Sequence, residues 1–277
     1  MSMFNTVILL GTLTGILLAV GWLLGGMAGV AIALVFSAVI NFASYWYSDK
    51  IVLAMYHAKP FANKEIDGML ERLAREARIA KPRLYVVDGA APNAFATGRD
   101  DKNAVVAVTN GMLGLEKAEM EGVLAHELGH IVNKDMLVSS MAATIAGAIS
   151  FAAQFGYWAM LSGERDGRMR LIGFVFMVFF APIAAMLVRM AISRQREYLA
   201  DFTSSTLTRN PKALASALRK ISAGAGHSNQ GSVAASHLWI VNPFKGDWFV
   251  NMFSTHPPVQ KRIERLEEIA HAVGQKG

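Results

Sequence analysis

The residues best suited to chemistry form one short run, His126-Glu127-Leu128-Gly129-His130. Because the two histidines are four positions apart, a helix would place them one turn apart on the same face, where they can share one metal ion. Glu127 stands beside that face and can reach a metal-bound water, which is the general-base position of a metallopeptidase. The alternative is a helix that carries two histidines by chance. The run therefore predicts a catalytic zinc site held by His126 and His130.

A second segment, SRQREYLAD at residues 193–201, offers the third protein ligand that a catalytic zinc site requires. Glu197 and Asp201 are four positions apart and would face the same way on a helix. We expect Glu197 to bind zinc and Asp201 to accept the free ring N–H of a ligand histidine, with His126 as the favoured partner. The alternative is that Glu197 forms a surface ion pair with a neighbouring arginine of the same segment.

Composition excludes several other kinds of chemistry. The 277 residues include no cysteine, so disulfides, Cys-ligated zinc and thiol catalysis are all ruled out. The net charge is +6, but the basic residues are spread through polar segments without an aromatic-interleaved basic patch. That distribution does not favour nucleic acid as a partner, and in a membrane protein it is better interpreted as a topology signal.

Long uncharged segments distinguish this chain from an ordinary soluble protein, with 53% hydrophobic and only 17% charged residues. No charged side chain occurs in residues 2–48, 136–163 or 171–188. Since a helix needs about 20 apolar residues to cross a hydrocarbon core, these gaps predict about four transmembrane helices. A cleavable signal peptide is the alternative for the first gap, but that gap is too long and lacks a basic start.

The uncharged segments divide the chain into four parts. We expect a transmembrane hairpin at 1–48, the first part of a catalytic domain at 49–135, a second hairpin at 136–192, and the rest of the catalytic domain at 193–277. Four crossings would place both polar parts on one side of the membrane. The short link at 162–170 carries three arginines, whereas the polar parts hold the other 24 basic residues. This bias predicts that both polar parts face the cytoplasm.

The polar parts predict an α+β domain. Helices are expected over Asn63–Ile79, Glu116–Asn133, Lys212–Ser222 and Pro257 to about Ala272. Val-rich runs predict strands over 83–88 and 103–109, with a short strand at 93–98 between them. The first hairpin would consist of two helices, Phe4 to about Leu24 and Met27 to about Tyr47, joined by a turn at Gly25-Gly26.

Four segments together resemble one family. They are NAFATG at 93–98, HELGH at 126–130, SRQREYLAD at 193–201 and THPPVQKRIERL at 255–266. In this order they match the pattern of the HtpX-type membrane zinc metallopeptidases, which are related to the CAAX prenyl proteases, and the resemblance spans nearly the full length. It implies a gluzincin-like catalytic domain facing the cytoplasm, with one Zn²⁺ per chain, in a multi-pass protein of the plasma membrane. It also implies that the enzyme degrades misfolded or damaged membrane proteins.

The resemblance implies roles for three further residues. An edge strand at 93–98 could pair with an extended substrate, with the Asn93 side-chain amide and the Ala94 carbonyl as contacts. The alternative is a plain hairpin strand with a turn-favouring Asn93. His256 would lie near the zinc and could stabilise the tetrahedral oxyanion. The alternative is that His256 simply caps the helix that begins at Pro257.

The predicted activity is zinc-assisted hydrolysis of peptide bonds by an endopeptidase, with Glu127 as general base. An intramembrane zinc protease is one rival, but charged residues such as Glu116 and Asp135 flank the motif and place it outside the hydrocarbon. A CAAX prenyl protease usually has more membrane spans. A membrane scaffold with a structural zinc would need four protein ligands, whereas three are found.

We expect proteins or peptides, mainly membrane proteins, as substrates and the lipid bilayer as a partner. The sequence predicts no oligomeric state.

Overall fold

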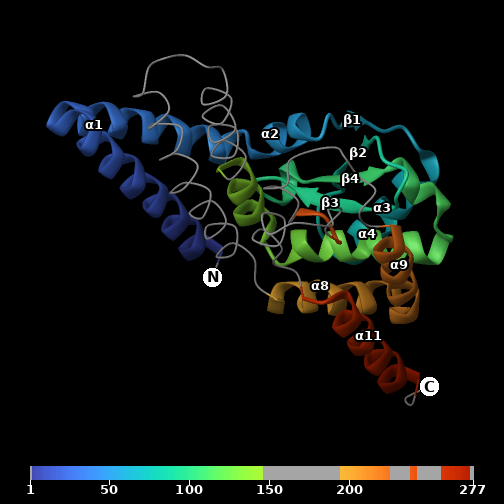
Figure 1. Ribbon diagram of the computed structural model, residues 1–277. Helices are drawn as coiled ribbons and strands as arrows, with labels where there is room; N and C mark the ends of the chain where they lie inside the picture. Colours follow the sequence, from blue (N-terminus) through green and yellow to red (C-terminus); the bar gives the residue numbers. More distant parts are fainter. Residues whose placement is uncertain (1, 146–193, 225–237, 242–256, 275–277) are drawn as a thin grey trace, which may run out of the picture.

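An apolar helical hairpin projects from an α+β domain (Figure 1). The structure is a computed structural model, and it describes residues 2–145, 194–224, 238–241 and 257–274. Within these residues a small mixed sheet lies on one side of a central helix, and further helices lie on the other side (Figure 1).

The hairpin is formed by α1 (Ser2–Trp46), which is interrupted by non-helical backbone at Gly25 and Gly26. Gly26 has a φ of 55°, a left-handed conformation that glycine adopts without steric cost. The two arms approach most closely at Gly21 and Gly29, where a Cβ added to Gly29 would lie 1.9 Å from the Gly21 carbonyl oxygen. Small residues at this crossing therefore let the arms pack backbone to backbone. The predicted hairpin and its turn are confirmed.

One segment among the described residues, Gly25–Trp46, is long and apolar enough to cross a bilayer. A shorter apolar helix, Met136–Ile145, follows the metal-binding motif and packs Met141 and Ile145 near Leu10 of the hairpin. The remainder of the predicted second hairpin lies outside the described residues. The prediction of about four spans therefore stays a prediction.

Within the described part of the chain, the sheet has four strands in the order β1-β2-β4-β3. The strands are β1 (Lys59–Pro60), β2 (Arg83–Val87), β3 (Ala94–Thr97) and β4 (Val105–Thr109). β2 and β4 are parallel, whereas the β1–β2 and β3–β4 pairs are antiparallel. Three strands were predicted from the sequence and are confirmed. β1 was not predicted, because two residues are too short to show an alternating pattern.

The helices of the domain that the structure describes are α2 (Ser48–Met55), α3 (Lys64–Glu76), α4 (Lys117–Val132), α8 (Arg194–Thr208), α9 (Pro211–Gly224) and α11 (Val259–Gly274), with short 3₁₀ turns at Asp101–Asn103 and Asn110–Gly114. Four of these helices, α3, α4, α9 and α11, lie close to their predicted positions, whereas α2 was not predicted and α8 was predicted without bounds. Asn63 caps α3 by accepting from the backbone amides of Glu65 and Ile66. Asn210 does the same for α9 by accepting from the Ala213 amide. These caps explain why the helix starts could be predicted.

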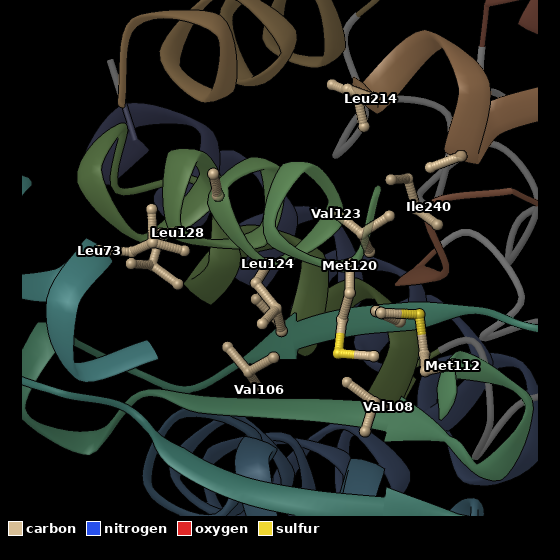
Figure 2. Packing of buried hydrophobic residues seen from close by; sticks show 14 of the residues in the cluster. Leu73, Val106, Val108, Met112, Met120, Val123, Leu124, Leu128, Leu214 and Ile240 are labelled. Carbon is tan, nitrogen blue, oxygen red and sulfur yellow. The ribbon is translucent and has the colours of Figure 1, made fainter. Parts of the chain in front are cut away.

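Helix α4 lies at the centre of the main hydrophobic core. Leu124 and Leu128 are fully buried on α4, and Figure 2 shows Leu124 pointing toward Val106 of β4. Helices α8 and α9 contact α4 as well. Truncating a fully buried leucine of this kind to alanine typically destabilises a protein by about 2–5 kcal/mol. The core therefore holds the motif-bearing helix firmly between the sheet and the later helices.

Candidate metal centre

Three side chains from two helices converge on one point. The candidate ligand atoms of His126 and His130 on α4 and of Glu197 on α8 all lie within 4.8 Å of one another. The two histidine Nε2 atoms are 3.2 Å apart, and each lies 3.7 Å from a carboxylate oxygen of Glu197. The structure thus brings together the three residues that the sequence singled out as zinc ligands.

A glycine allows α8 to come close enough to supply Glu197. A Cβ added to Gly129 would lie 2.9 Å from the Cα of Ala200, so any larger residue would force the two helices apart. Gly129 lies between the two histidines in sequence, and Ala200 lies one turn after Glu197. The close approach of the helices therefore sets the position of Glu197 relative to His126 and His130.

Carboxylates orient both histidine rings. The Nδ1 atom of His126 is 2.9 Å from Asp201 Oδ1, and the Nδ1 atom of His130 is 3.2 Å from Asp135 Oδ1. A proton on each Nδ1, donated to the carboxylate, leaves the Nε2 lone pair available to a cation. The structure places Asp201 beside His126, the partner favoured from the sequence. The role of Asp135 was missed, although an acid just beyond the helix end was a possible signal.

Arg262 of α11 is fully buried and joins the acidic groups of the site. Its Nε and Nη2 donate to the two carboxylate oxygens of Asp201 at 2.9 and 2.6 Å. Its Nη1 lies 3.3 Å from Glu197 Oε2. Sequence reasoning missed this residue, although the signal was present. Arg262 falls on the same helical face as Ile263 and Leu266, and a charge on an apolar face needs a buried partner.

The charges around the two histidines give them opposite protonation preferences. Burial and the nearby Arg262 lower the pKa of His126 to about 4. Burial also disfavours the charged form of His130, but Asp135 and Glu197 outweigh it and raise the pKa of His130 to about 10. Burial opposes ionisation of Asp201 too, but Arg262 and His126 lower the pKa of that carboxyl. A cation at this point would therefore meet a neutral His126 and would have to displace a proton from His130.

Glu127 is buried beside the ligands, and neither of its carboxylate oxygens has a hydrogen-bond partner among the described residues. Burial, reinforced by the charge of Glu197, raises the pKa of Glu127 to about 8 against the opposing effect of His130. A buried carboxylate without a partner is rare and calls for an explanation. A water held by a bound metal ion would supply the missing partner.

The donor set fits a catalytic zinc ion. Two imidazole nitrogens and one carboxylate oxygen are ordinary zinc ligands, and three protein ligands leave the fourth tetrahedral position open. The unpartnered carboxylate of Glu127 lies next to that set. A structural zinc would instead be enclosed by four protein ligands. Among the described residues, this is the group of His, Asp and Glu side chains that could hold a metal ion.

Of the residues expected to contact substrate, Ala94 is the first residue of β3 at the edge of the sheet, and Asn93 directly precedes it. Asn93 and Ala94 are both buried, and residues 238–241 cover them. The predicted contacts with substrate stay a prediction. Ile240 donates its amide to the Ala94 carbonyl at 3.0 Å, and the Asn93 side chain donates to the Val241 carbonyl at 2.8 Å. His256 lies outside the described residues.

The fold and the site together are those of a zinc metallopeptidase, a class of hydrolase, with His126, Glu127 and His130 on one helix and Glu197 on another. The sequence matches Peptidase family M48 over residues 60–270. It is 46% identical to the Protease HtpX homolog of Persephonella marina, over 99% of each chain. It is 48% identical to the Protease HtpX homolog of Thermococcus sibiricus, over 98% of this chain and 97% of that one. The chain belongs to peptidase family M48, as an HtpX-type metalloprotease of the membrane that uses zinc.

A solved structure shares the fold. The crystal structure of Ste24p from S. mikatae matches with a TM-score of 0.50 and 19% identity, over 96% of this chain and 65% of that chain. At this level of identity the likeness concerns the fold, which combines a mixed sheet with many helices. The comparisons confirm the predicted family, enzyme class and cofactor.

Proposed function

We propose that this protein is a zinc endopeptidase that hydrolyses misfolded or damaged membrane proteins as part of membrane quality control. The observation that carries the proposal is the convergence of His126, His130 and Glu197 within 4.8 Å beside the unpartnered Glu127. The substrate class follows from the family resemblance and from the apolar hairpin, which anchors the domain next to membrane-embedded substrates.

We assign each residue of the site one role in peptide hydrolysis. His126, His130 and Glu197 hold the metal, and Asp201 fixes the ring of His126. A zinc ion held there would lower the pKa of a water bound to it and would polarise the scissile carbonyl. Glu127 takes a proton from the attacking water and passes it to the leaving amine as the C–N bond breaks.

Three more residues have proposed roles. We assign stabilisation of the oxyanion to His256. This assignment rests on the family resemblance alone, because His256 lies outside the described residues. Asn93 and Ala94 would hold the substrate backbone, because an edge strand can pair with an extended peptide. Support comes from the position of β3 at the edge of the sheet and from the peptide segment that these two residues already bind.

We propose about four membrane crossings, with residues 49–135 and 193–277 forming one catalytic domain on the cytoplasmic side of the plasma membrane. Support comes from the packing of α4 against α8 and α9, which unites the two polar parts, and from the family match over residues 60–270. The uncharged gaps and the bias of basic residues supply the remaining support.

Cleavage of fluorescein-labelled β-casein by the full-length protein in detergent tests the activity. Removing zinc with EDTA should abolish cleavage while lowering the melting temperature only modestly, and adding zinc back should restore cleavage. Glu197→Gln should lose both bound zinc and cleavage, whereas the matched variant Glu268→Gln, at an exposed position on α11, should keep both. A chain that unfolds on chelation and never cleaves casein would indicate a scaffold with a structural zinc instead.

A further inference from the structure

Residues Leu238–Val241 form a short buried segment that contains no α-helix or β-strand. All four side chains are less than 9% exposed. The segment meets the outer edge of β3 at its first residue, Ala94, and no further strand pairs with this edge among the described residues. The segment therefore occupies the edge that is proposed to bind substrate.

Backbone hydrogen bonds hold the segment as an added peptide would be held. The Ile240 amide donates to the Ala94 carbonyl at 3.0 Å. The Asn93 side chain donates to the Val241 carbonyl at 2.8 Å, and the Val241 amide lies 3.5 Å from Asn93 Oδ1. One side-chain amide thus faces both backbone groups of Val241, a pattern that recognises a backbone rather than particular side chains.

The segment also reaches the metal centre. Arg262 Nη1 donates to the Ile240 carbonyl at 2.9 Å, and the same nitrogen lies 3.3 Å from Glu197 Oε2. A single guanidinium nitrogen therefore contacts both the segment and a proposed metal ligand. The segment is therefore linked to the metal centre through one side chain.

The side chains of the segment fill apolar pockets on both sides of its backbone. Ile240 belongs to the main core cluster, and Figure 2 shows it beside Val123 of α4, on the side of Leu214 of α9. Trp239 belongs to the second cluster, where its ring centroid lies 4.7 Å from that of Phe95. The surroundings of Ile240 are therefore apolar.

We infer that Leu238–Val241 is an internal ligand of the peptide-binding groove, which substrate must displace before it can be cut. The same contacts indicate the substrate class, which is an extended peptide with a bulky aliphatic residue at the position of Ile240. This inference rests on the proposed function, because it takes the edge of β3 as the substrate site. Only molecules whose groove is open can bind substrate, so the apparent affinity equals the intrinsic affinity multiplied by the open fraction.

Weakening the internal ligand should strengthen substrate binding. In Ile240→Ala, the KM for β-casein should fall at least about threefold with little change in kcat, because the open fraction rises. The matched control is Ile66→Ala on α3, which truncates another buried isoleucine of the same core cluster away from the groove. The control should be destabilised without a fall in KM. Equal KM values in the two folded variants would overturn the inference.

A peptide copy of the segment offers a second test. Acetyl-Leu-Trp-Ile-Val-amide should inhibit casein cleavage competitively, with an inhibition constant at least about threefold lower for Ile240→Ala than for the wild type. The same peptide with Ile replaced by Asp should be at least about tenfold weaker, because the pocket around Ile240 is apolar. Lack of competition by the first peptide, or equal inhibition by both peptides, would contradict the inference.

Hydrogen exchange keeps the inference testable if Ile240→Ala does not fold. In the zinc-bound Glu127→Gln variant, β-casein should bind without being consumed, and the amides of residues 238–241 should exchange at least about threefold faster. Unchanged or slower exchange with casein bound would overturn the inference. Failure of the wild type to cleave casein at all would count against the proposed function instead.

Discussion

Helix α4 carries two buried glutamates about two turns apart, and their surroundings are opposite. Glu119 accepts from the backbone amide of Glu116 at 3.0 Å, from the Ser216 hydroxyl at 2.6 Å and from the Lys220 ammonium at 2.8 Å. Glu127 has no hydrogen-bond partner for either carboxylate oxygen among the described residues. The two residues have the same side chain and lie on the same helix, so their partners make the difference.

The partners set the charge of each glutamate. Burial opposes ionisation of Glu119, but Lys220 and Ser216 outweigh it and lower its pKa. Burial raises the pKa of Glu127 to about 8. A carboxylate that is fully supplied with donors ties helices together, as Glu119 ties α4 to α9. A carboxylate left without donors remains available for proton transfer. In enzymes, perturbed pKa values concentrate at the active sites where such transfers take place.

The largest effect is expected at Arg262, the buried cation that pairs with Asp201 and Glu197 beside the metal centre. Arg262→Met should leave Asp201 buried without its bidentate partner, destabilising the protein by about 3–5 kcal/mol. Zinc affinity should fall by about 10- to 100-fold, because Asp201 would no longer orient His126 firmly. Urea denaturation and a zinc titration measure the two effects. The control is Arg265→Met, at an exposed position on the same helix, and zinc affinity equal to that of this control would contradict the assignment.

A smaller effect is expected at the other end of the helix. Glu119→Gln should destabilise the protein by about 1–3 kcal/mol, because Lys220 loses the charge it pairs with. The kcat for casein should stay unchanged, since Glu119 lies away from the metal centre. Thermal denaturation and casein cleavage measure the two quantities. A fall in kcat of about tenfold or more, with the fold intact, would mean that Glu119 also takes part in the chemistry.

The smallest effect concerns a single proton. The pKa of His130 is raised to about 10, so its ring is protonated at neutral pH, whereas zinc binds only the neutral ring. Zinc binding should therefore release a proton, and affinity should rise with pH by up to about tenfold per unit below pH 10. Calorimetry in two buffers of different ionisation enthalpy counts the protons released. Zinc binding without proton release at neutral pH would contradict this charge assignment for His130.

The sequence predicted the parts of the site that depend on local periodicity. Spacing of four residues on a helix was enough to place His126 with His130 and Glu197 with Asp201. Capping residues and apolar periodicity located the starts of α3 and α9 and the extent of α4. These features are encoded within single helices, so no knowledge of the tertiary structure was required.

Contacts between distant segments could not be predicted in this way. Arg262 reaches Asp201 across 61 positions of the sequence, and Asn93 reaches Val241 across 148 positions. Neither contact leaves a repeating pattern in the chain, because it depends on how α11 and residues 238–241 fold back onto the sheet and α4. The lack of partners around Glu127 is likewise visible only in three dimensions.

The most direct test is the kcat of Glu127→Gln for β-casein at saturating zinc, with bound metal and melting temperature measured on the same sample. We predict a loss of about 10²- to 10⁴-fold in kcat, because the variant removes the general base. Zinc should remain bound, because Glu127 is not one of the three proposed metal ligands, and the melting temperature should change little because glutamine has nearly the same shape. A zinc-loaded, folded variant whose kcat matches that of the wild type would contradict the account of Glu127 as the base.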